Sequence, residues 1–246
     1  MTSRPRSLAD DTSGMTDRSE KARGHQIVIA IDGPAASGKS STAQWVAKRL
    51  GYNHVDSGAL YRALTAVALR RHPDPSGWTE AKVLAGGGSV ALEPDGRSMA
   101  PVLDGKRADD EIRGSDVNKN VSTVARMPGV RKWVNDQVRK AAASLDVVVD
   151  GRDMGTAVFP QAQLKVFLIA DPWERARRRL LQSLGRGPTD EEIADETDRL
   201  VKRDAGDSTQ TVQASDAVLI DTTYLTQEEQ VERIVALAHA VSHRSA

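Results

Sequence analysis

The residues from Gly33 to Ser41 have the composition of a phosphate-binding loop. Gly33-Pro34-Ala35-Ala36-Ser37-Gly38-Lys39-Ser40 matches the pattern G-x-x-x-x-G-K-[S/T] at every fixed position, and Ser41 follows directly. The two glycines let the backbone curl so that its N–H groups point at phosphate oxygens. In this motif the lysine reaches the β- and γ-phosphates and the next hydroxyl binds Mg²⁺. The loop therefore predicts nucleoside triphosphate binding by residues 33–41, without saying which reaction follows.

The segments on either side of this loop support the prediction. An apolar run over 27–31 comes before it, and a helical pattern with Ala43, Val46, Ala47 and Leu50 on one face comes after it. A strand, a glycine-rich turn and a helix in this order place the positive end of the helix dipole at the bound phosphates.

Arginines form the second group of residues that could do chemistry. Arg62 and Arg152 each follow a short apolar run, four arginines crowd positions 175–179, and Arg203 lies in a polar stretch that we expect to be a loop. Each of these arginines alone is typical of a solvated surface charge, and adjacent helical positions cannot all face one ligand. Beside a phosphate loop, however, guanidinium groups at strand ends favour a reaction that joins two phosphorylated substrates, because they offset the repulsion between the two polyanions.

Strands and helices are expected to alternate along the chain. The patterns predict further strands over 52–55, 147–150, 164–169 and 217–220, and helices over about 59–71 and 128–143, with a last helix that buries Val231, Ile234, Val235 and Ala238. In the helix over 128–143, Val130, Trp133, Val134, Val138 and Ala141 should face inward. The predicted fold is α/β with a parallel sheet.

Turn and cap signals refine this outline. Segments 89–92 and 99–103 flank a Pro-Asp-Gly turn and predict a small antiparallel insert, in which Gly86-Gly87-Gly88 suggests loose packing. Asp171 and Pro172 have the form of a helix start, and Thr189 with Glu192, like Thr226 with Glu229, has the form of a capping box.

Composition excludes several classes of protein. Lysine plus arginine and aspartate plus glutamate are both 34, so the net charge of zero gives no argument for nucleic-acid or membrane binding. The chain has no cysteine, which rules out disulfides and thiolate metal sites, and its five histidines lack metal-ligand spacing, so we expect packing or surface roles for them. Residues 1–24 have no apolar signal sequence and are expected to be a disordered tail without function. These features together favour a cytoplasmic protein.

Four blocks in order carry a resemblance to a known family. They are GPAASGKSS, DSGALYR, EIR followed by VSTVARMPGVR, and DGRDMGTAVFP, and from about residue 26 to 240 the chain resembles bacterial cytidylate kinase (CMP kinase). The resemblance implies a P-loop kinase with a five-stranded parallel sheet flanked by helices, a mobile lid and a small antiparallel β insert in the NMP-binding region. It implies a core of about 25–58, 121–171 and 205–246, an NMP-binding region of about 59–120 and a lid of about 172–204. The implied reaction is phosphoryl transfer from ATP to CMP or dCMP with Mg²⁺, by a protein expected to be a monomer.

The resemblance also assigns roles to residues. For ATP these are Gly33, Pro34, Ala35, Ala36, Ser37, Gly38, Lys39, Ser40 and Ser41, with Arg175, Arg178 and Arg179 approaching from the lid. For CMP they are Ser57, Arg62, Ser122, Arg131, Arg152, Asp153, Arg203 and Asp207. Lys39, Arg62, Arg152 and Arg178 would carry the transfer, Ser40 would bind Mg²⁺ directly, and Asp150 would either orient Mg²⁺ through water or cap its loop.

The base-reading assignment makes physical sense, because the Asp153 carboxylate could accept from the amino group of cytosine and would repel the carbonyl oxygen of uracil. No general base is required, since the acceptor is already a phosphate anion.

Two departures from the family pattern affect substrate affinity more than fold. Gln210 stands where the family usually has an arginine for the CMP phosphate, and segment 212–215 lacks the expected Pro-Leu. The loss would weaken monophosphate affinity or transfer the role to Arg203. Two alternatives stay open: a kinase for a related small acceptor such as UMP, and a non-catalytic nucleotide-binding regulatory module. A GTPase switch is disfavoured, because the chain has no Asn-Lys-x-Asp guanine reader and 118–121 only resembles one superficially.

Overall fold

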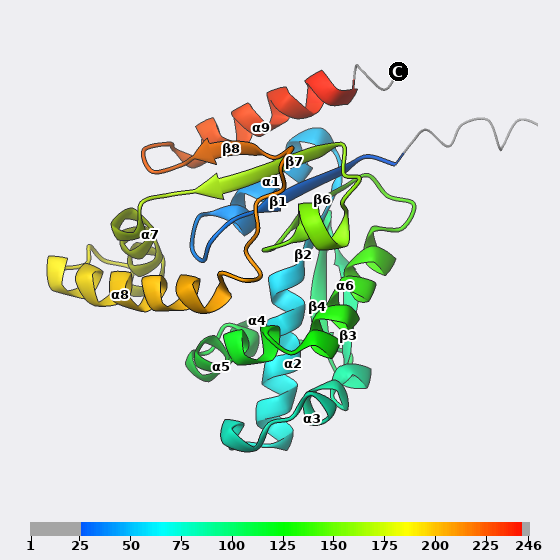
Figure 1. The fold of residues 1–246 in the computed structure, drawn as a ribbon, viewed down its shortest axis with the longest axis vertical. Coiled ribbons are helices and arrows are strands. Elements are labelled where there is room, and N and C mark those ends of the chain that lie inside the picture. Colours follow the sequence, from blue (N-terminus) through cyan, green and yellow to red (C-terminus); the bar gives the residue numbers. More distant parts are fainter. Residues whose placement is uncertain (1–25, 243–246) are drawn as a thin grey trace, which may run out of the picture.

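Five parallel strands form the centre of one sheet in the computed structural model, which describes residues 26–242 (Figure 1). The expectation of a disordered tail over 1–24 lies outside the described residues. The strands are short and rich in valine, isoleucine and leucine, as is typical of strands buried on both faces. They are β1 (Val28–Asp32), β2 (Asn53–Asp56), β6 (Val147–Asp150), β7 (Leu164–Ile169) and β8 (Val218–Asp221). The prediction of a parallel α/β sheet is confirmed, and the five expected strands are neighbours in it, although the sheet of the described residues has eight strands because the insert joins it.

The order of the strands places a ligand crevice at β1. The sheet runs β3-β4-β2-β6-β1-β7-β8, so β6 and β2 lie on one side of β1 and β7 and β8 on the other. In open parallel sheets, ligands bind beyond the carboxyl ends of the strands where the chain leaves in both directions. The loop after β1 is the predicted phosphate loop, which therefore opens into this crevice.

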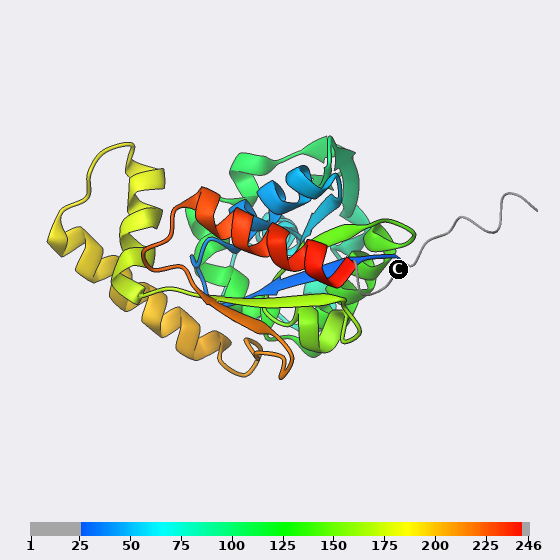
Figure 2. The ribbon, with the colours of Figure 1, turned by 90° about the horizontal axis from the view of Figure 1, so that it is seen from above.

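Alternating side chains of the central strands build two cores. Val28 and Ala30 of β1 pack with the helices below the sheet in Figure 1, and Ile29 and Ile31 pack with the helices above it. The lower layer consists of α2 (Ser57–Arg71), α5 (Ser115–Ala125) and α6 (Pro128–Ala142), and the upper layer of α1 (Lys39–Leu50) and α9 (Gln227–Ser242). Figure 2 shows α9 lying across this upper face. The predicted boundaries of α2 and α6 agree with the observed ones within about two residues.

The insert is part of the main sheet and is closely packed. It consists of β3 (Val90–Asp95), β4 (Ser98–Leu103) and β5 (Lys106–Arg107), and β4 pairs in parallel with β2 as well as antiparallel with β3. The expectation of loose packing at the triple glycine was wrong. A Cβ on Gly86 would lie 2.7 Å from Val67, and one on Gly87 would lie 3.1 Å from Trp133. These glycines allow close approach of α2 and α6.

Three helices were not predicted: α3 (Glu80–Leu84), α4 (Asp109–Ile112) and α5. The first two are short, whereas α5 contains two asparagines but has Val117, Val121 and Val124 at helical spacing, a signal that could have identified it. In α6, Val130, Val134, Val138 and Ala142 are buried, whereas Trp133 and Ala141 are only half-buried. The inward face is therefore rotated slightly from the predicted one.

Two further helices, α7 (Pro172–Leu184) and α8 (Asp190–Asp207), form an antiparallel hairpin beside the sheet (Figure 1). Asp171 caps α7, and Thr189 with Glu192 forms the capping box of α8, as predicted. The expectation that Arg203 lies in a loop was wrong, because α8 continues to Asp207 and buries Ile193 and Leu200 along one face. The expected boundary between lid and core, at residues 204/205, falls inside this helix. No helix within residues 26–242 is long and apolar enough to cross a membrane.

Candidate active site

The loop after β1 has a backbone conformation that only small residues allow. Gly33 has a φ of 149°, and a Cβ there would collide with the carbonyl oxygen of Leu168 in β7. Gly38 (φ 87°) begins α1, and Ala36 also adopts a left-handed conformation with a φ of 57°. The first glycine is therefore required by packing against the neighbouring strand, which sequence reasoning did not identify.

Lys39 is buried in the loop that it belongs to. Its Nζ donates to the carbonyl oxygen of Pro34 at 2.5 Å and lies 3.4 Å from Ser37 Oγ. Burial lowers the pKa of Lys39 well below its usual value, and the charge of Arg152 lowers it further. A triphosphate bound in the loop would place negative charge beside Lys39 and favour the protonated form of this side chain.

Ser40, Asp150 and His54 form a chain of hydrogen bonds between α1 and the sheet. Ser40 Oγ donates to Asp150 Oδ2 at 2.5 Å, and His54 Nε2 lies 2.8 Å from Asp150 Oδ1. Burial opposes the charged form of His54, but the hydrogen bond and charge of Asp150 raise its pKa overall. The sequence did not predict this partner. Only its position, two residues before the end of β2, could have indicated it.

Asp32, at the end of β1, holds the loop after β6 in place. Its two carboxylate oxygens accept the backbone N–H groups of Met154 and Gly155, both at 2.8 Å. Burial raises the pKa of Asp32 to about 6, although these two hydrogen bonds act in the opposite direction. Asp32 is thus a site-positioning residue that sequence reasoning missed.

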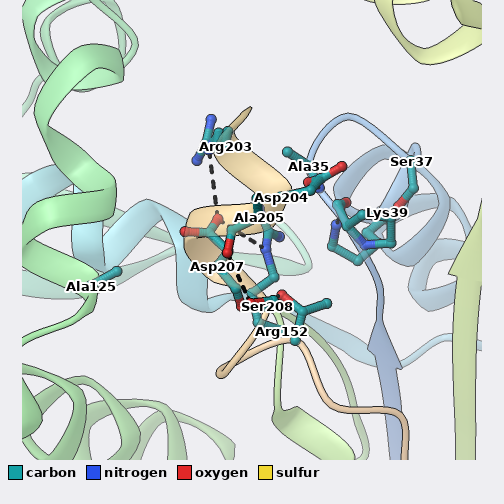
Figure 3. A network of polar contacts seen from close by, with 12 residues as sticks. Ala35, Ser37, Lys39, Ala125, Arg152, Arg203, Asp204, Ala205, Asp207 and Ser208 are labelled. Carbon is teal, nitrogen blue, oxygen red and sulfur yellow. Dashed lines mark hydrogen bonds and ion pairs between the residues drawn. The ribbon is translucent and has the colours of Figure 1, made fainter. Parts of the chain in front are cut away.

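A cluster of arginines lies beside the phosphate loop. Arg152 Nε and Arg203 Nε each lie 3.7 Å from Asp207 Oδ2 (Figure 3). Both Nε atoms are buried and make no hydrogen bond within the described part of the chain. Burial lowers the pKa of Arg203 to about 10, and the charges of Arg152 and Arg62 add to this. Such a surplus of buried positive charge favours an anionic ligand.

Arg62 reaches the same region from α2. Its Nη1 donates to Asn118 Oδ1 at 2.6 Å, so α5 holds this guanidinium in place. Burial lowers the pKa of Arg62. The charge of Asp56 partly offsets this shift, and the charges of other arginines, including Arg152, increase it. The structure therefore brings together Arg62, Arg152 and Arg203, which lie far apart in the sequence.

The predicted base-reading residues lie near α6. Arg131 forms an ion pair with Asp153, and both side chains are mostly buried. Burial raises the pKa of Asp153 even though Arg131 lowers it. Tyr61 adds a buried hydroxyl that has no hydrogen-bond partner among residues 26–242, and its pKa is raised by burial and influenced by Arg131 and Asp153. Tyr61 precedes Arg62 directly and was missed as a candidate.

Two predicted serines of the acceptor site are placed differently. Ser57 is buried at the start of α2, and its Oγ donates to the carbonyl oxygen of Asp150 at 2.8 Å. Ser122 is half-buried on α5. Ser57 thus joins the ends of β2 and β6 in this conformation.

The arginines of α7 point in different directions, as their spacing predicts. Arg175 is buried; its Nη1 donates to Ala35 O at 2.7 Å and pairs with Asp204 at 2.6 Å. Asp204 also accepts Ala35 N–H at 3.0 Å, so the lid binds both backbone groups of this loop residue. Arg178 donates to the carbonyl oxygens of residues 222 and 223, and Arg179 pairs with Glu196.

The remaining residues considered for the site, Ser41 and Gln210, make only local contacts. Ser41 Oγ donates to Gly38 O at 2.9 Å. Gln210 follows α8 in a turn, and its backbone N–H donates to the carbonyl oxygen of Asp207. The exposed Arg126 lies beside α8, with its Nη1 3.4 Å from the position of a Cβ on Gly206.

The chain is similar to known proteins along most of its length. A family model described as cytidylate kinase matches residues 29–240. The chain is 42% identical over 220 residues to a cytidylate kinase of Lactiplantibacillus plantarum, with 86% of this chain and 94% of the relative covered. It is 43% identical over 217 residues to a cytidylate kinase of Geobacillus kaustophilus, with 87% and 97% covered. A solved shikimate kinase from Bacteroides thetaiotaomicron is more distant, with 15% identity, a TM-score of 0.44 and 87% and 98% covered.

Proposed function

Because the chain belongs to the cytidylate kinase family, we propose that it transfers the γ-phosphoryl group of ATP to CMP or dCMP, giving ADP and CDP or dCDP. One observation carries the proposal: a phosphate loop at the end of β1 lies next to a buried arginine cluster at the ends of β2, β6 and α8. Two adjacent anion sites suit the joining of two phosphorylated substrates.

The ATP phosphates would bind residues 33–41. The backbone of the loop and the N-terminus of α1 provide donors, and Lys39 would leave Pro34 O to meet the β- and γ-phosphates. Arg175 would act by holding Ala35, while Arg178 and Arg179 would approach the phosphates from α7. Closure of the lid would then exclude water from the transfer.

The oxygen ligands beside the loop suit Mg²⁺. A hydroxyl and a carboxylate converge at Ser40 and Asp150, which are hard donors of the kind that Mg²⁺ prefers together with phosphates and water. We assign Ser40 as a direct ligand and Asp150 as a ligand through water, oriented by His54. The ion would neutralise charge on the β- and γ-phosphates.

The acceptor would bind with its phosphate on Arg62, Arg152 and Arg203, and its ribose near Asp207. The unsatisfied Nε atoms of Arg152 and Arg203 are free to donate to phosphate oxygens. Arg126 lies beside Gly206 on α8, and we propose that it supplies a further cation on this side of the helix. We propose that the protein acts as a monomer.

Cytosine would bind between Asp153 and Arg131, near Ser57 and Ser122. The Asp153 carboxylate, held by Arg131, can accept from the exocyclic amino group. Uracil presents a carbonyl oxygen there, which would leave a buried carboxylate facing an acceptor. Specificity for cytosine over uracil follows from this pair.

A coupled ADP-release assay with Mg²⁺·ATP and each of CMP, dCMP, UMP, AMP and GMP tests the proposal. We expect fast turnover with CMP and dCMP and far slower turnover with UMP. Asp153→Ala should lower the ratio of kcat/KM for CMP to that for UMP by about 10-fold or more. Lys39→Ala should abolish turnover and leave the fold intact. An absence of turnover with every monophosphate, despite ATP binding, would indicate a regulatory nucleotide-binding protein instead.

A further inference from the structure

The chain after Arg152 and Asp153 forms a short helix of a rare kind. Residues Met154–Val158 make a single π-turn, η3, in which the carbonyl oxygen of Asp153 accepts the N–H groups of residues 156–158. Such turns are uncommon and often lie at functional sites. One helical turn by itself is barely stable, because it fixes several dihedral angles for few hydrogen bonds. Other parts of the chain must therefore hold this turn in place.

The N-terminal end of η3 is capped by a residue from another strand. An aspartate that precedes a helix usually accepts the first free N–H groups with its own carboxylate. Asp153 has this position, but its side chain makes no such hydrogen bond. The Asp32 carboxylate of β1 accepts the N–H groups of Met154 and Gly155 instead. The carboxylate of Asp153 is thereby left for its ion pair with Arg131 and for a ligand.

The C-terminal end of η3 is capped by Arg139 of α6. Its Nη2 donates to the carbonyl oxygen of Ala157 at 2.8 Å, and its Nε donates to that of Val158 at 3.1 Å. The last carbonyl groups of a helix have no N–H partner within the helix, and a cation at this end complements the helix dipole. Charged side chains from two other elements thus fix both ends of the turn.

The helix that carries Arg139 also carries the partner of Asp153. Arg131 and Arg139 lie about two turns apart on α6, one in contact with Asp153 and the other with the far end of η3. The helix between them is fixed, because Val134 and Val138 are fully buried in the larger core. The position of Asp153 relative to Arg131 therefore depends on how firmly η3 is attached to α6.

From these contacts we propose that Arg139 is a positioning residue for acceptor binding. It holds η3 so that Arg152 faces the acceptor phosphate and Asp153 faces the base, and it acts through the turn rather than by contact with a ligand. The inference rests on the proposed function, since it takes CMP as the acceptor. Without Arg139 the C-terminal end of η3 opens, the positions of Arg152 and Asp153 spread, and small displacements of such groups weaken binding strongly.

Steady-state kinetics of Arg139→Ala test the proposal. The KM for CMP should rise about 5- to 30-fold, as expected for loss of a charged hydrogen-bond donor, and the KM for Mg²⁺·ATP should stay within about twofold. The ratio of kcat/KM for CMP to that for UMP should also fall, because Asp153 shifts relative to Arg131. Arg139→Lys can still donate to one carbonyl oxygen and should recover part of the loss.

Hydrogen exchange reports on the turn directly, without any ligand. The amides of residues 156–159 are hydrogen-bonded in η3, so they should exchange faster in Arg139→Ala than in the unmodified protein. The amides of β6, which lie in the sheet ladder, should exchange at the same rate in both.

Two variants of the same helix are matched controls. Lys140→Ala removes the neighbouring exposed cation and should leave the KM for CMP unchanged. Val138→Ala removes buried apolar contacts without touching the guanidinium of Arg139. It should lower the melting temperature at least as much as Arg139→Ala does, yet leave the KM for CMP within about twofold.

Four results would each overturn the proposal. They are an unchanged KM for CMP in Arg139→Ala, an equal rise in the KM for CMP and for ATP, unchanged exchange of residues 156–159, and an equally raised KM for CMP in Val138→Ala. In each case turnover of CMP by the unmodified protein shows that the proposed function stands. An unmodified protein that phosphorylates no monophosphate would overturn that function, and the role of Arg139 in acceptor binding with it.

Discussion

At the scale of single residues, the environment of a side chain decides its role more than its type does. Gly33 and Gly51 both have positive φ, yet a Cβ on Gly33 would collide with the backbone of β7, whereas a Cβ on Gly51 would have nothing within 4 Å. The backbone of Gly51 is left-handed helical, whereas a φ of 149° at Gly33 is a region that side chains other than glycine rarely adopt, so both backbone and packing make Gly33 the stricter position.

Replacement of these glycines should therefore differ in cost. Gly51→Ala should lower the free energy of unfolding by about 1 kcal/mol, from the left-handed backbone alone. Gly33→Ala should cost about 1–3 kcal/mol more, because the backbone of β1 or β7 must shift. Urea unfolding of the two variants measures the difference. Equal losses would show that the contact with Leu168 relaxes freely.

Asp32 should make stability depend on pH. Burial raises its pKa in the folded protein from about 4 to about 6, so the folded state binds the proton more tightly than the unfolded state. The contribution of Asp32 to the free energy of unfolding is fully present below about pH 4 and is lost as pH rises through about 6. The shift in pKa corresponds to roughly 3 kcal/mol.

The measurement is the pH dependence of unfolding for the protein and for Asp32→Asn. Between pH 4 and pH 7 the unmodified protein should lose up to about 3 kcal/mol relative to the variant. Parallel profiles would mean that the carboxylate is ionised normally in the folded state.

At the scale of elements, the main connection is between the lid and the phosphate loop. Arg175 on α7 and Asp204 on α8 together hold both backbone groups of Ala35 and pair with each other. The lid has only a small apolar cluster of its own, which also includes Ala35. The polar contacts are thus a large part of what fixes the hairpin against the loop.

Breaking this pair should be costly, since the Arg175 side chain is only 5% exposed. Asp204→Ala should lower the free energy of unfolding by about 3 kcal/mol, because it leaves a buried guanidinium without its partner. The exposed pair of Arg177 and Glu174 is the control, and Arg177→Ala should cost less than about 1 kcal/mol. Chemical denaturation compares the two, and Asp204→Asn should recover part of the loss. A cost for Asp204→Ala as small as that of the control would show that the lid position does not depend on the pair.

At the scale of the whole molecule, the sheet joins the core and the insert into one body, whereas the hairpin of α7 and α8 shares little apolar packing with that body. Pairing of β4 with β2 continues the hydrogen-bond ladder into the insert, and the larger apolar cluster extends from β1 through α2 to α6. The hairpin of α7 and α8 shares only the small cluster of Ala35, Ala176, Ile193 and Leu200.

Hydrogen exchange should reproduce this division. Amides of β1, β6 and α2 should exchange only by global unfolding, and those of α7 and α8 should exchange earlier by local opening. Addition of Mg²⁺·ATP should slow exchange in the two lid helices more than in α6. Mass spectrometry of peptides follows both effects. Equal protection of lid and sheet would contradict a lid that opens separately.

The sequence by itself determined the α/β class, the five parallel strands, the phosphate loop and the helix caps at Asp171, Thr189 and Thr226, because these depend on local periodicity and local hydrogen bonds. The family resemblance indicated which distant arginines belong to one site. Only the tertiary structure decided how they lie: Arg203 on a helix, Arg175 buried against the loop, and His54 and Asp32 supporting residues on other strands. These contacts join residues far apart in the chain. Their strength comes from the burial of polar side chains, and apolar periodicity does not indicate which polar side chains become buried.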